Sequence, residues 1–444
     1  MDDHTSIQQE SVSASEPEHR ANPLSLPSGH QRSVSSPRAP ERWVAEQLLN
    51  LAGGPSVAIE LWNGELIGPV AGAAARFTLR IGDRKALYGM LSNPNLAFGD
   101  LYSAGRVDVD GDLAGFLTEV AAHLERQQER MSASARWLAR GRATPRAASE
   151  RAAKGNIQHH YDLGNEFYRL WLDTAAMQYT CAYYEEPDLT LEQAQLAKLE
   201  HVCRKLDLKP GQRVVELGCG WGGLARYMAR EYGVSVRAFN ISREQVEYAR
   251  EQAACEGLED RVEYVLDDYR NICGEYDAFV SVGMLEHVGT DNYATVARLI
   301  RNHLRKDGLA LIHTIGRNRP AGINAWIEKR IFPGAYPPSI TQLTGLAEAG
   351  PLSVLDIENL RLHYAETLTD WLARYEDNID EVRAMYDEHF VRAWRLYLSG
   401  SIAAFRASSL QLFQMVLAHP QNNEIPRNRK RLHTAPAYPE ESAG

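Results

Sequence analysis

The sequence predicts an α/β fold in which a mainly parallel sheet carries helices on both faces and follows a smaller α/β domain. From residue 156 onward, apolar stretches of strand length alternate with helical stretches, as in proteins with parallel sheets. The first of these apolar stretches ends in a glycine-rich turn that leads into a helix. A chain of 444 residues is also too long for one ordinary hydrophobic core, so we expect two domains.

The composition divides the chain into an N-terminal segment, two domains, a linker and a tail. Residues 1–40 are rich in Ser, Pro, Glu and His and are expected to be disordered, because they can bury little apolar surface. Residues 41–131 are expected to form the small domain. A linker rich in Arg and Ala spans residues 132–155, the second domain spans residues 156–420, and a polar, basic tail spans residues 421–444.

In the small domain, alternating apolar residues at 57–62 and 75–81 predict strands around a turn at Asn63-Gly64. Residues 116–124 are expected to be helical. This domain shows no cluster of catalytic residue types, so the chemistry is expected in the second domain.

In the second domain, helices are expected at residues 243–256 and 293–304, among others. Ligands of such sheets bind at the carboxyl ends of the strands, so a functional site is expected there. The expected strands are 213–217, 235–240, 262–267, 278–282 and 309–314.

The turn after the first of these strands is the most informative feature of the chain. Gly218, Gly220 and Gly222 follow the acidic Glu216, and glycine lets a backbone turn sharply and approach a ligand. The spacing lacks the later glycine of the dinucleotide fingerprint and the Lys-Ser/Thr of a phosphate-binding loop. It therefore favours a cofactor without a pyrophosphate, and S-adenosylmethionine (SAM) fits best. The alternative is a merely tight strand–helix turn.

The next strand ends supply further candidates. No acidic residue follows the second strand, so Asn240 or Gln245 would have to bind the ribose hydroxyls of the cofactor. After the third strand, Asp268 can accept a hydrogen bond from the adenine amino group, and Tyr269 can pack on the adenine ring.

Composition excludes several classes of function. The net charge of −10 argues against a dominant role in nucleic-acid binding. No apolar stretch approaches the length of a spanning helix, and the N-terminus lacks the apolar core of a signal peptide. The five cysteines show no metal or disulfide pattern, so we expect free thiols in a reducing cytosol and no metal site.

The motifs of the second domain resemble those of the cyclopropane fatty acid synthases and the related mycolic acid methyltransferases. They occur in the family's order up to about residue 417, and residues 77–117 resemble the N-terminal domain of bacterial members. The resemblance implies a Rossmann-like class I SAM-dependent methyltransferase fold. The motifs lie at residues 156–165, 179–182, 216–223, 286–289, 313–316, 332–334 and 363–368.

The resemblance also implies a reaction. The methyl carbon of SAM would be transferred to a cis double bond of a phospholipid acyl chain, and the resulting carbocation would close to a cyclopropane ring when a base removes a proton. In the family, this base is thought to be a bound bicarbonate ion. Carried onto this sequence, the residues that hold the ion are Cys181, Glu286, His313, Tyr364 and the backbone of Ile315.

This chemistry agrees with the residue types. A small anion held by polar donors supplies a base and a counter-charge in a dry site. Taken alone, Glu286 and His313 would as readily be structural, but their place at adjacent strand ends favours catalysis. Cys181 could also be a nucleophile or an inert buried residue, although direct methyl transfer needs no nucleophile.

The resemblance adds Tyr179 and Thr180, near the SAM carboxylate, to the cofactor residues. Positions from Tyr364 to Phe413 would line an acyl tunnel, with ordinary core packing as the alternative for each residue. The expected cofactor-binding set is Tyr179, Thr180, Glu216, Gly218, Cys219, Gly220, Gly222, Asn240, Ile241, Ser242, Gln245, Asp268 and Tyr269.

Two other functions remain open. One is a methyltransferase of the same fold that leaves a methyl-branched or methylene product, and the other is a lipid-binding protein with a decayed site. The expected partner is an unsaturated phospholipid, and a homodimer is compatible with the sequence. We expect a cytoplasmic protein that associates peripherally with the inner face of the membrane. The contact would be made by the N-terminal domain or by the basic segments 132–155 and 427–431. The alternative for the two basic segments is that they are solvated connectors.

Overall fold

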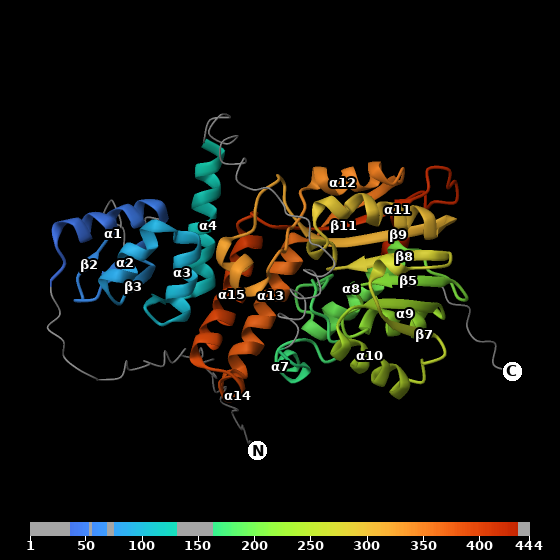
Figure 1. Ribbon diagram of the computed structural model, residues 1–444, viewed down its shortest axis with the longest axis horizontal. Helices are drawn as coiled ribbons and strands as arrows, with labels where there is room; N and C mark the ends of the chain where they lie inside the picture. Colours follow the sequence, from blue (N-terminus) through green and yellow to red (C-terminus); the bar gives the residue numbers. More distant parts are fainter. Residues whose placement is uncertain (1–35, 53–55, 69–74, 131–162, 434–444) are drawn as a thin grey trace, which may run out of the picture. The chain divides into compact units, whose positions relative to one another are not determined.

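Figure 1 shows the computed structural model, which describes residues 36–52, 56–68, 75–130 and 163–433. The linker expected at 132–155 and most of the N-terminal segment lie outside these residues. Within the described parts of the chain, no helix has the length and apolar character that a membrane crossing requires.

The second domain is built on one mixed sheet. Its strands are β5 (Arg213–Leu217), β6 (Ser235–Asn240), β7 (Val262–Leu266), β8 (Tyr276–Val282), β9 (Leu304–Gly316), β10 (Ser353–Asn359) and β11 (Gln411–Ala418). The order across the sheet is β10-β11-β9-β8-β5-β6-β7. Neighbours from β9 to β7 are parallel, whereas β11 runs antiparallel to both β9 and β10.

The predicted α/β fold with a mainly parallel sheet is confirmed. Strands β5 and β6 have the predicted bounds, while β9 extends beyond the predicted residues 309–314 at both ends. The antiparallel strands β10 and β11 were not predicted. Strand β11 is buried along its whole length but contains Gln411 and Gln414, which interrupt the apolar run that marks a buried strand.

Helices cover both faces of the sheet (Figure 1). One face packs in a hydrophobic cluster with α8 (Leu191–Lys205), α9 (Gly223–Tyr232) and α10 (Arg243–Cys255). The other packs with α11 (Tyr293–His303) and α12 (Ile340–Ala349). The local sequence fixes where α8 begins, because Thr190 and Gln193 form a reciprocal capping box that satisfies two otherwise unpaired amides.

A separate group of helices carries a cluster of aromatic side chains. These helices are α7 (Asn165–Arg169), α13 (Arg361–Asp377), α14 (Ile379–Met385) and α15 (Glu388–Arg406). Trp171, which follows α7, is fully buried and lies at the centre of the cluster. Its indole is 5.2–5.9 Å, between ring centroids, from Phe167, Tyr168, Tyr179, Trp371 and Trp394.

The small domain combines a sheet of the order β2-β1-β3-β4 with flanking helices. The strands are β1 (Val57–Leu61), β2 (Leu66–Ile67), β3 (Phe77–Ile81) and β4 (Val107–Asp110). The helices are α1 (Ala39–Ala52), α2 (Arg84–Ser92), α3 (Pro94–Ser103) and α4 (Leu113–Arg130). Helix α4 contains the helical stretch predicted at 116–124.

Two expectations for the N-terminal region need correction. The Asn63-Gly64 turn does not join the two predicted strands, β1 and β3, but joins β1 to the short β2. The strands β1 and β3 are parallel, and a tight turn can connect only antiparallel strands. The N-terminal segment also becomes ordered before residue 41. Helix α1 starts at Ala39, and the buried Glu41 carboxylate accepts the Arg38 backbone N–H at 2.6 Å.

Helix α15 contacts α3 and α4 of the small domain. The Arg392 guanidinium donates to the Tyr102 carbonyl at 2.6 Å and lies 4.2 Å from the centroid of the Tyr102 ring. The attraction between the guanidinium cation and the face of the ring adds to the stabilisation from the hydrogen bond. Arg392 therefore helps to attach the small domain to the second domain.

The described part of the expected tail packs against the second domain. Arg431 donates to the carbonyls of Arg204 and Lys205 at 2.9 and 3.1 Å, and Arg429 donates to Asp356 at 2.6 Å. Leu432 is buried. Two cations of the 427–431 cluster are therefore used within the molecule, which makes this cluster a weaker candidate for lipid contact.

Replacing Trp171 by alanine is expected to lower the free energy of unfolding by about 3–5 kcal/mol, because it leaves a cavity at the centre of the aromatic cluster. Trp43 supplies a matched control, since its side chain is 57% exposed and its loss should change stability by about 0.5 kcal/mol or less. Urea denaturation followed by circular dichroism measures both. Equal effects of the two substitutions would contradict a central role for Trp171.

Candidate active site

The turn at residues 216–223, called the glycine turn below, connects β5 to α9. Gly218, Gly220 and Gly222 have positive φ values of 77°, 53° and 78°, which side-chain-bearing residues rarely adopt. A Cβ at Gly222 would lie 2.5 Å from the Tyr264 hydroxyl, whereas a Cβ at Gly220 would meet no atom of the described residues within 4 Å. The turn therefore requires glycine for its conformation, and none of the described residues fills the space beside Gly220.

Two buried ionisable side chains lie at the start of this turn and next to it. Glu216 is fully buried, and its Oε2 has no hydrogen-bond partner among the described residues. Burial raises the pKa of Glu216 to about 8, although the charges of Lys198 and Arg226 act in the opposite direction. Lys198 on α8 donates to Gln178 at 2.5 Å and to the Thr180 hydroxyl at 2.8 Å, and burial lowers its pKa to about 8.

The end of β6 distinguishes between the two ribose candidates. The Asn240 amide donates to the Gly220 carbonyl at 3.1 Å and to Gln245 Oε1 at 2.9 Å. The Asn240 oxygen accepts the backbone amides of Ile241 and Ser242. Asn240 thus anchors the glycine turn, whereas the buried Gln245 Nε2 has no partner among the described residues and is the better candidate for a ribose contact.

The end of β7 holds Asp268 and Tyr269 together with an unforeseen arginine. Arg270 donates through Nε and Nη2 to the two carboxylate oxygens of Asp268, both at 2.7 Å. The same guanidinium lies 5.5 Å from the centroid of the Tyr269 ring. A planar guanidinium fork suits a carboxylate, so an adenine amino group would have to share Asp268 with Arg270.

Glu286 lies in the short 3₁₀ helix Leu285–His287 that follows β8, and His313 lies within β9 as the strand partner of Val282, the last residue of β8. Glu286 Oε1 accepts the backbone N–H of Ile315 at 2.5 Å. The other carboxyl oxygen, Oε2, and the His313 Nε2 atom are both buried and have no partner among the described residues. Burial raises the pKa of Glu286 to about 7 and lowers that of His313 well below its usual value. Such buried, unmatched polar atoms are costly and typical of functional sites.

Cys181 and Tyr364 belong to the aromatic side of the site. The Cys181 thiol is fully buried and lies 3.1 Å from the Ala182 carbonyl oxygen and 3.9 Å from that of Leu360. Burial raises the pKa of this thiol well above its usual range, so it is neutral and a poor nucleophile. The Tyr364 ring packs against Phe405 at 4.7 Å and Trp371 at 6.0 Å between centroids.

The first sequence motif, 156–165, is described only from residue 163. Asn165 accepts the indole N–H of Trp221 at 2.7 Å, and the Tyr386 hydroxyl donates to the Leu163 carbonyl at 2.7 Å. The described end of this motif therefore contacts the glycine turn through Trp221.

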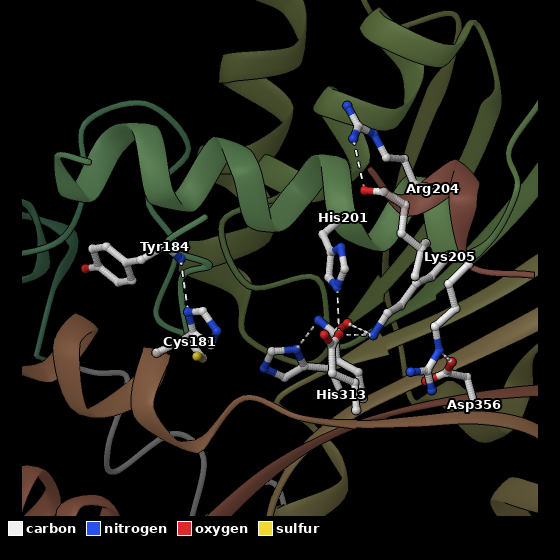
Figure 2. A network of polar contacts seen from close by, with 12 residues as sticks. Cys181, Tyr184, His201, Arg204, Lys205, His313 and Asp356 are labelled. Carbon is white, nitrogen blue, oxygen red and sulfur yellow. Dashed lines mark hydrogen bonds and ion pairs between the residues drawn. The ribbon is translucent and has the colours of Figure 1, made fainter. Parts of the chain in front are cut away.

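Sequence reasoning missed a set of contacting polar residues that we call the buried polar chain: His313, Gln414, Lys205, Glu358 and His201. All are buried except Glu358, whose side chain is 32% exposed. Figure 2 shows His201 and Lys205 of α8 and His313 of β9 within it. A signal was available, because α8 places Gln195, Lys198, His201 and Lys205, all buried, at three- and four-residue spacing. That spacing puts them on one helix face, and polar residues on a buried face indicate a shared network.

Comparisons with known proteins identify the family of this chain. Residues 148–415 match the mycolic acid cyclopropane synthetase family. The chain is 35% identical over 390 residues to the "Probable fatty acid methyltransferase" of Pseudomonas putida. This alignment covers 84% of this chain and 95% of that protein. It is 43% identical over 270 residues to the cyclopropane-fatty-acyl-phospholipid synthase of Escherichia coli K12, which covers 60% of this chain and 69% of that protein.

Solved structures show the same relationship. The cyclopropane synthase MmaA2 from Mycobacterium tuberculosis matches with a TM-score of 0.57 and 29% identity, over 60% of this chain and 98% of that chain. The mycolic acid cyclopropane synthase CmaA1 complexed with SAH and CTAB matches with a TM-score of 0.56 and 31% identity, over 60% and 97% of the two chains. The chain therefore belongs to the mycolic acid cyclopropane synthetase family of SAM-dependent methyltransferases.

Proposed function

We propose that the protein transfers the methyl carbon of SAM to the cis double bond of an unsaturated phospholipid acyl chain and forms a cyclopropane ring. The observation that carries this proposal is the pair of buried atoms Glu286 Oε2 and His313 Nε2, which have no partner among the described residues. Glu286 follows β8 and His313 lies in β9, in the same sheet as the strand that leads into the glycine turn. The 43% identity to a cyclopropane-fatty-acyl-phospholipid synthase supports the choice of lipid and product.

The chain's own residues fit the two small molecules that this reaction needs. When bound, SAM supplies an electrophilic methyl carbon and bicarbonate supplies the base that takes a proton from it. The space beside Gly220, which no described residue fills, and Gln245 Nε2, which has no partner in the described part of the chain, suit a nucleoside. The unpaired Glu216 carboxyl oxygen suits the positive charge of a sulfonium ligand, because an opposite charge nearby favours the ionised carboxylate.

For the anion, we propose that four of the five groups named from the sequence contact it directly, Cys181, Glu286, His313 and Tyr364, and that the fifth, the Ile315 backbone, acts through Glu286. Glu286 and His313 each have a buried atom that has no partner among the described residues. The single S–H group of the neutral Cys181 thiol donates to the Ala182 carbonyl, so it would have to turn away from that oxygen to donate weakly to the ion. The Ile315 N–H is already bonded to Glu286 Oε1, so its role would be to orient the carboxyl group. The Glu286 carboxylate would accept the hydroxyl proton of the ion.

A developing cation on the acyl chain needs a site that excludes water. The buried rings of Tyr364, Trp371 and Phe405 provide an apolar wall whose π faces attract positive charge. We propose that this side of the aromatic cluster receives the acyl chain.

The proposed lipid substrate implies contact with a bilayer. We propose that the protein docks from the cytoplasm on the inner face of the membrane through the basic segment 132–155, since each basic residue near an anionic surface adds about 1 kcal/mol. Replacing the arginines of this segment by glutamine should weaken sedimentation with anionic liposomes. Equal sedimentation of the variant would exclude this segment as the contact.

The direct test of the proposed function is incubation of the protein with SAM, bicarbonate and vesicles of a cis-monounsaturated phospholipid. Mass spectrometry of the fatty acids should show a product heavier by one CH₂, and NMR should show a cyclopropane ring. A methyl-branched or methylene product would instead assign the protein to the other outcome of the same methyl transfer. Absence of any product despite SAM binding would refute the proposal.

Replacing Glu286 by glutamine should lower kcat by about 10²–10⁴-fold, the usual contribution of a positioned acid–base group. Because the pKa of Glu286 is raised to about 7 and the ionised form is the one proposed to accept the proton, wild-type kcat should fall as the pH drops below about 7. A pH profile of product formation measures this decline. The glutamine variant should lack it, and an identical profile in both proteins would contradict the assignment.

Replacing Cys181 by serine should lower kcat by less than about tenfold, because a neutral thiol that only donates a hydrogen bond contributes about 1 kcal/mol. The measurement is product formation under single-turnover conditions. A loss as large as that expected for the Glu286 variant would revive Cys181 as a nucleophile.

A further inference from the structure

The buried polar chain begins at the strand pair β9 and β11. His313 and Gln414 are direct partners in this antiparallel register, and Gln414 Nε2 lies 3.0 Å from His313 Nδ1. Gln414 Oε1 lies 2.7 Å from the Lys205 ammonium. All three side chains are at most 1% exposed, so solvent does not compete for these contacts.

The hydrogen-bond chemistry of Lys205 determines the direction of this chain. An ammonium group has only donors, so it must face the amide oxygen of Gln414. The amide nitrogen is then the atom that faces His313, and it can only donate. His313 Nδ1 must therefore accept, which leaves the ring proton on Nε2.

The outer end of the chain keeps Lys205 in place. Lys205 donates to Glu358 Oε2 at 2.5 Å, and His201 Nε2 lies 2.7 Å from the same oxygen. Although burial alone would raise the pKa of Glu358, the hydrogen bond from His201 and the charge of Lys205 lower it to about 2. The ionised Glu358 supplies the counter-charge that a buried ammonium group needs.

We propose that Gln414 and Lys205 are positioning residues that fix His313 as the neutral Nε2–H tautomer, so that His313 presents a hydrogen-bond donor to the anion site. The identity of the anion rests on the proposed function, but the tautomer does not. With His313 Nε2–H as donor and Glu286 Oε2 as acceptor, the site matches an anion that carries both an anionic oxygen and a hydroxyl group.

The substitution Gln414→Glu tests this directly, because it keeps the shape of the side chain and an oxygen for Lys205 but reverses the bond to His313. A carboxylate oxygen would accept from Nδ1 and move the ring proton away from Nε2. We expect kcat to fall by about 10²–10³-fold, as when one preorganised donor is removed from an active site. Gln411→Glu is the matched control, since Gln411 is buried on the same strand but bonds Asn359 and Ser408 and should leave the His313 tautomer unchanged.

The tautomer itself is measured by ¹⁵N NMR of histidine-labelled protein, with the His313 signals identified by their loss in His313→Gln. Wild-type protein should show the Nε2–H pattern and Gln414→Glu the Nδ1–H pattern. An Nδ1–H pattern in the wild type would overturn the proposal, even if Gln414→Glu does not fold. So would an unchanged tautomer and unchanged kcat in a folded Gln414→Glu protein.

This readout separates the inference from the proposed function. An Nε2–H wild type that makes no cyclopropane product would support the positioning role and refute the proposed reaction. A wild type that makes the product with an Nδ1–H ring would support the reaction and refute the positioning role. Lys205→Met adds an independent check, because without the ammonium group Gln414 is free to turn, and a mixture of His313 tautomers is expected.

Discussion

Desolvation at the carboxyl ends of the parallel strands is the constraint on which the rest of the site depends. Burial raises the pKa of Glu216 to about 8 and of Glu286 to about 7, and it lowers the pKa of Lys198 to about 8. Polar groups without water are stable only if neighbours satisfy them or a ligand does so. Neighbouring side chains satisfy Lys198 and Gln414. Glu286 Oε2 and His313 Nε2 have no partner among the described residues, so a ligand would have to satisfy them.

The aromatic helices make this desolvation possible. The cluster around Trp171 joins residues from α7, α13 and α15, and it includes both Cys181 and Tyr364 of the proposed anion site. The same packing that stabilises this region therefore buries these two side chains. Stability and chemistry are coupled here, because a cavity in the cluster would loosen the fold and hydrate the site.

Much of the parallel core was predictable, because its signals are local. Strands β5 and β6 read as short apolar runs, and the glycine turn combines three glycines that all adopt positive φ. The pairing within the small domain was not predictable in this way. The alternation of apolar residues in β1 and β3 is the same whether the two strands pair in parallel or antiparallel. Their parallel pairing becomes evident only from the structure, in which β2 follows β1 and pairs with it.

By itself, the sequence determined the fold class, the glycine turn, and the assignment of Glu286 to the segment after β8 and of His313 to β9, since each depends on residues close together in the chain. Only the tertiary structure decided which atoms are satisfied. It pairs Asn240 with the glycine turn, leaves Gln245 Nε2 without a partner among the described residues, and bonds Asp268 to Arg270. It also links His313 through Gln414 to Lys205 and Glu358. These last contacts join α8, β9, β10 and β11. The periodicity of side chains predicts which face of a helix or strand is buried. It does not predict which distant helix or strand packs against that face.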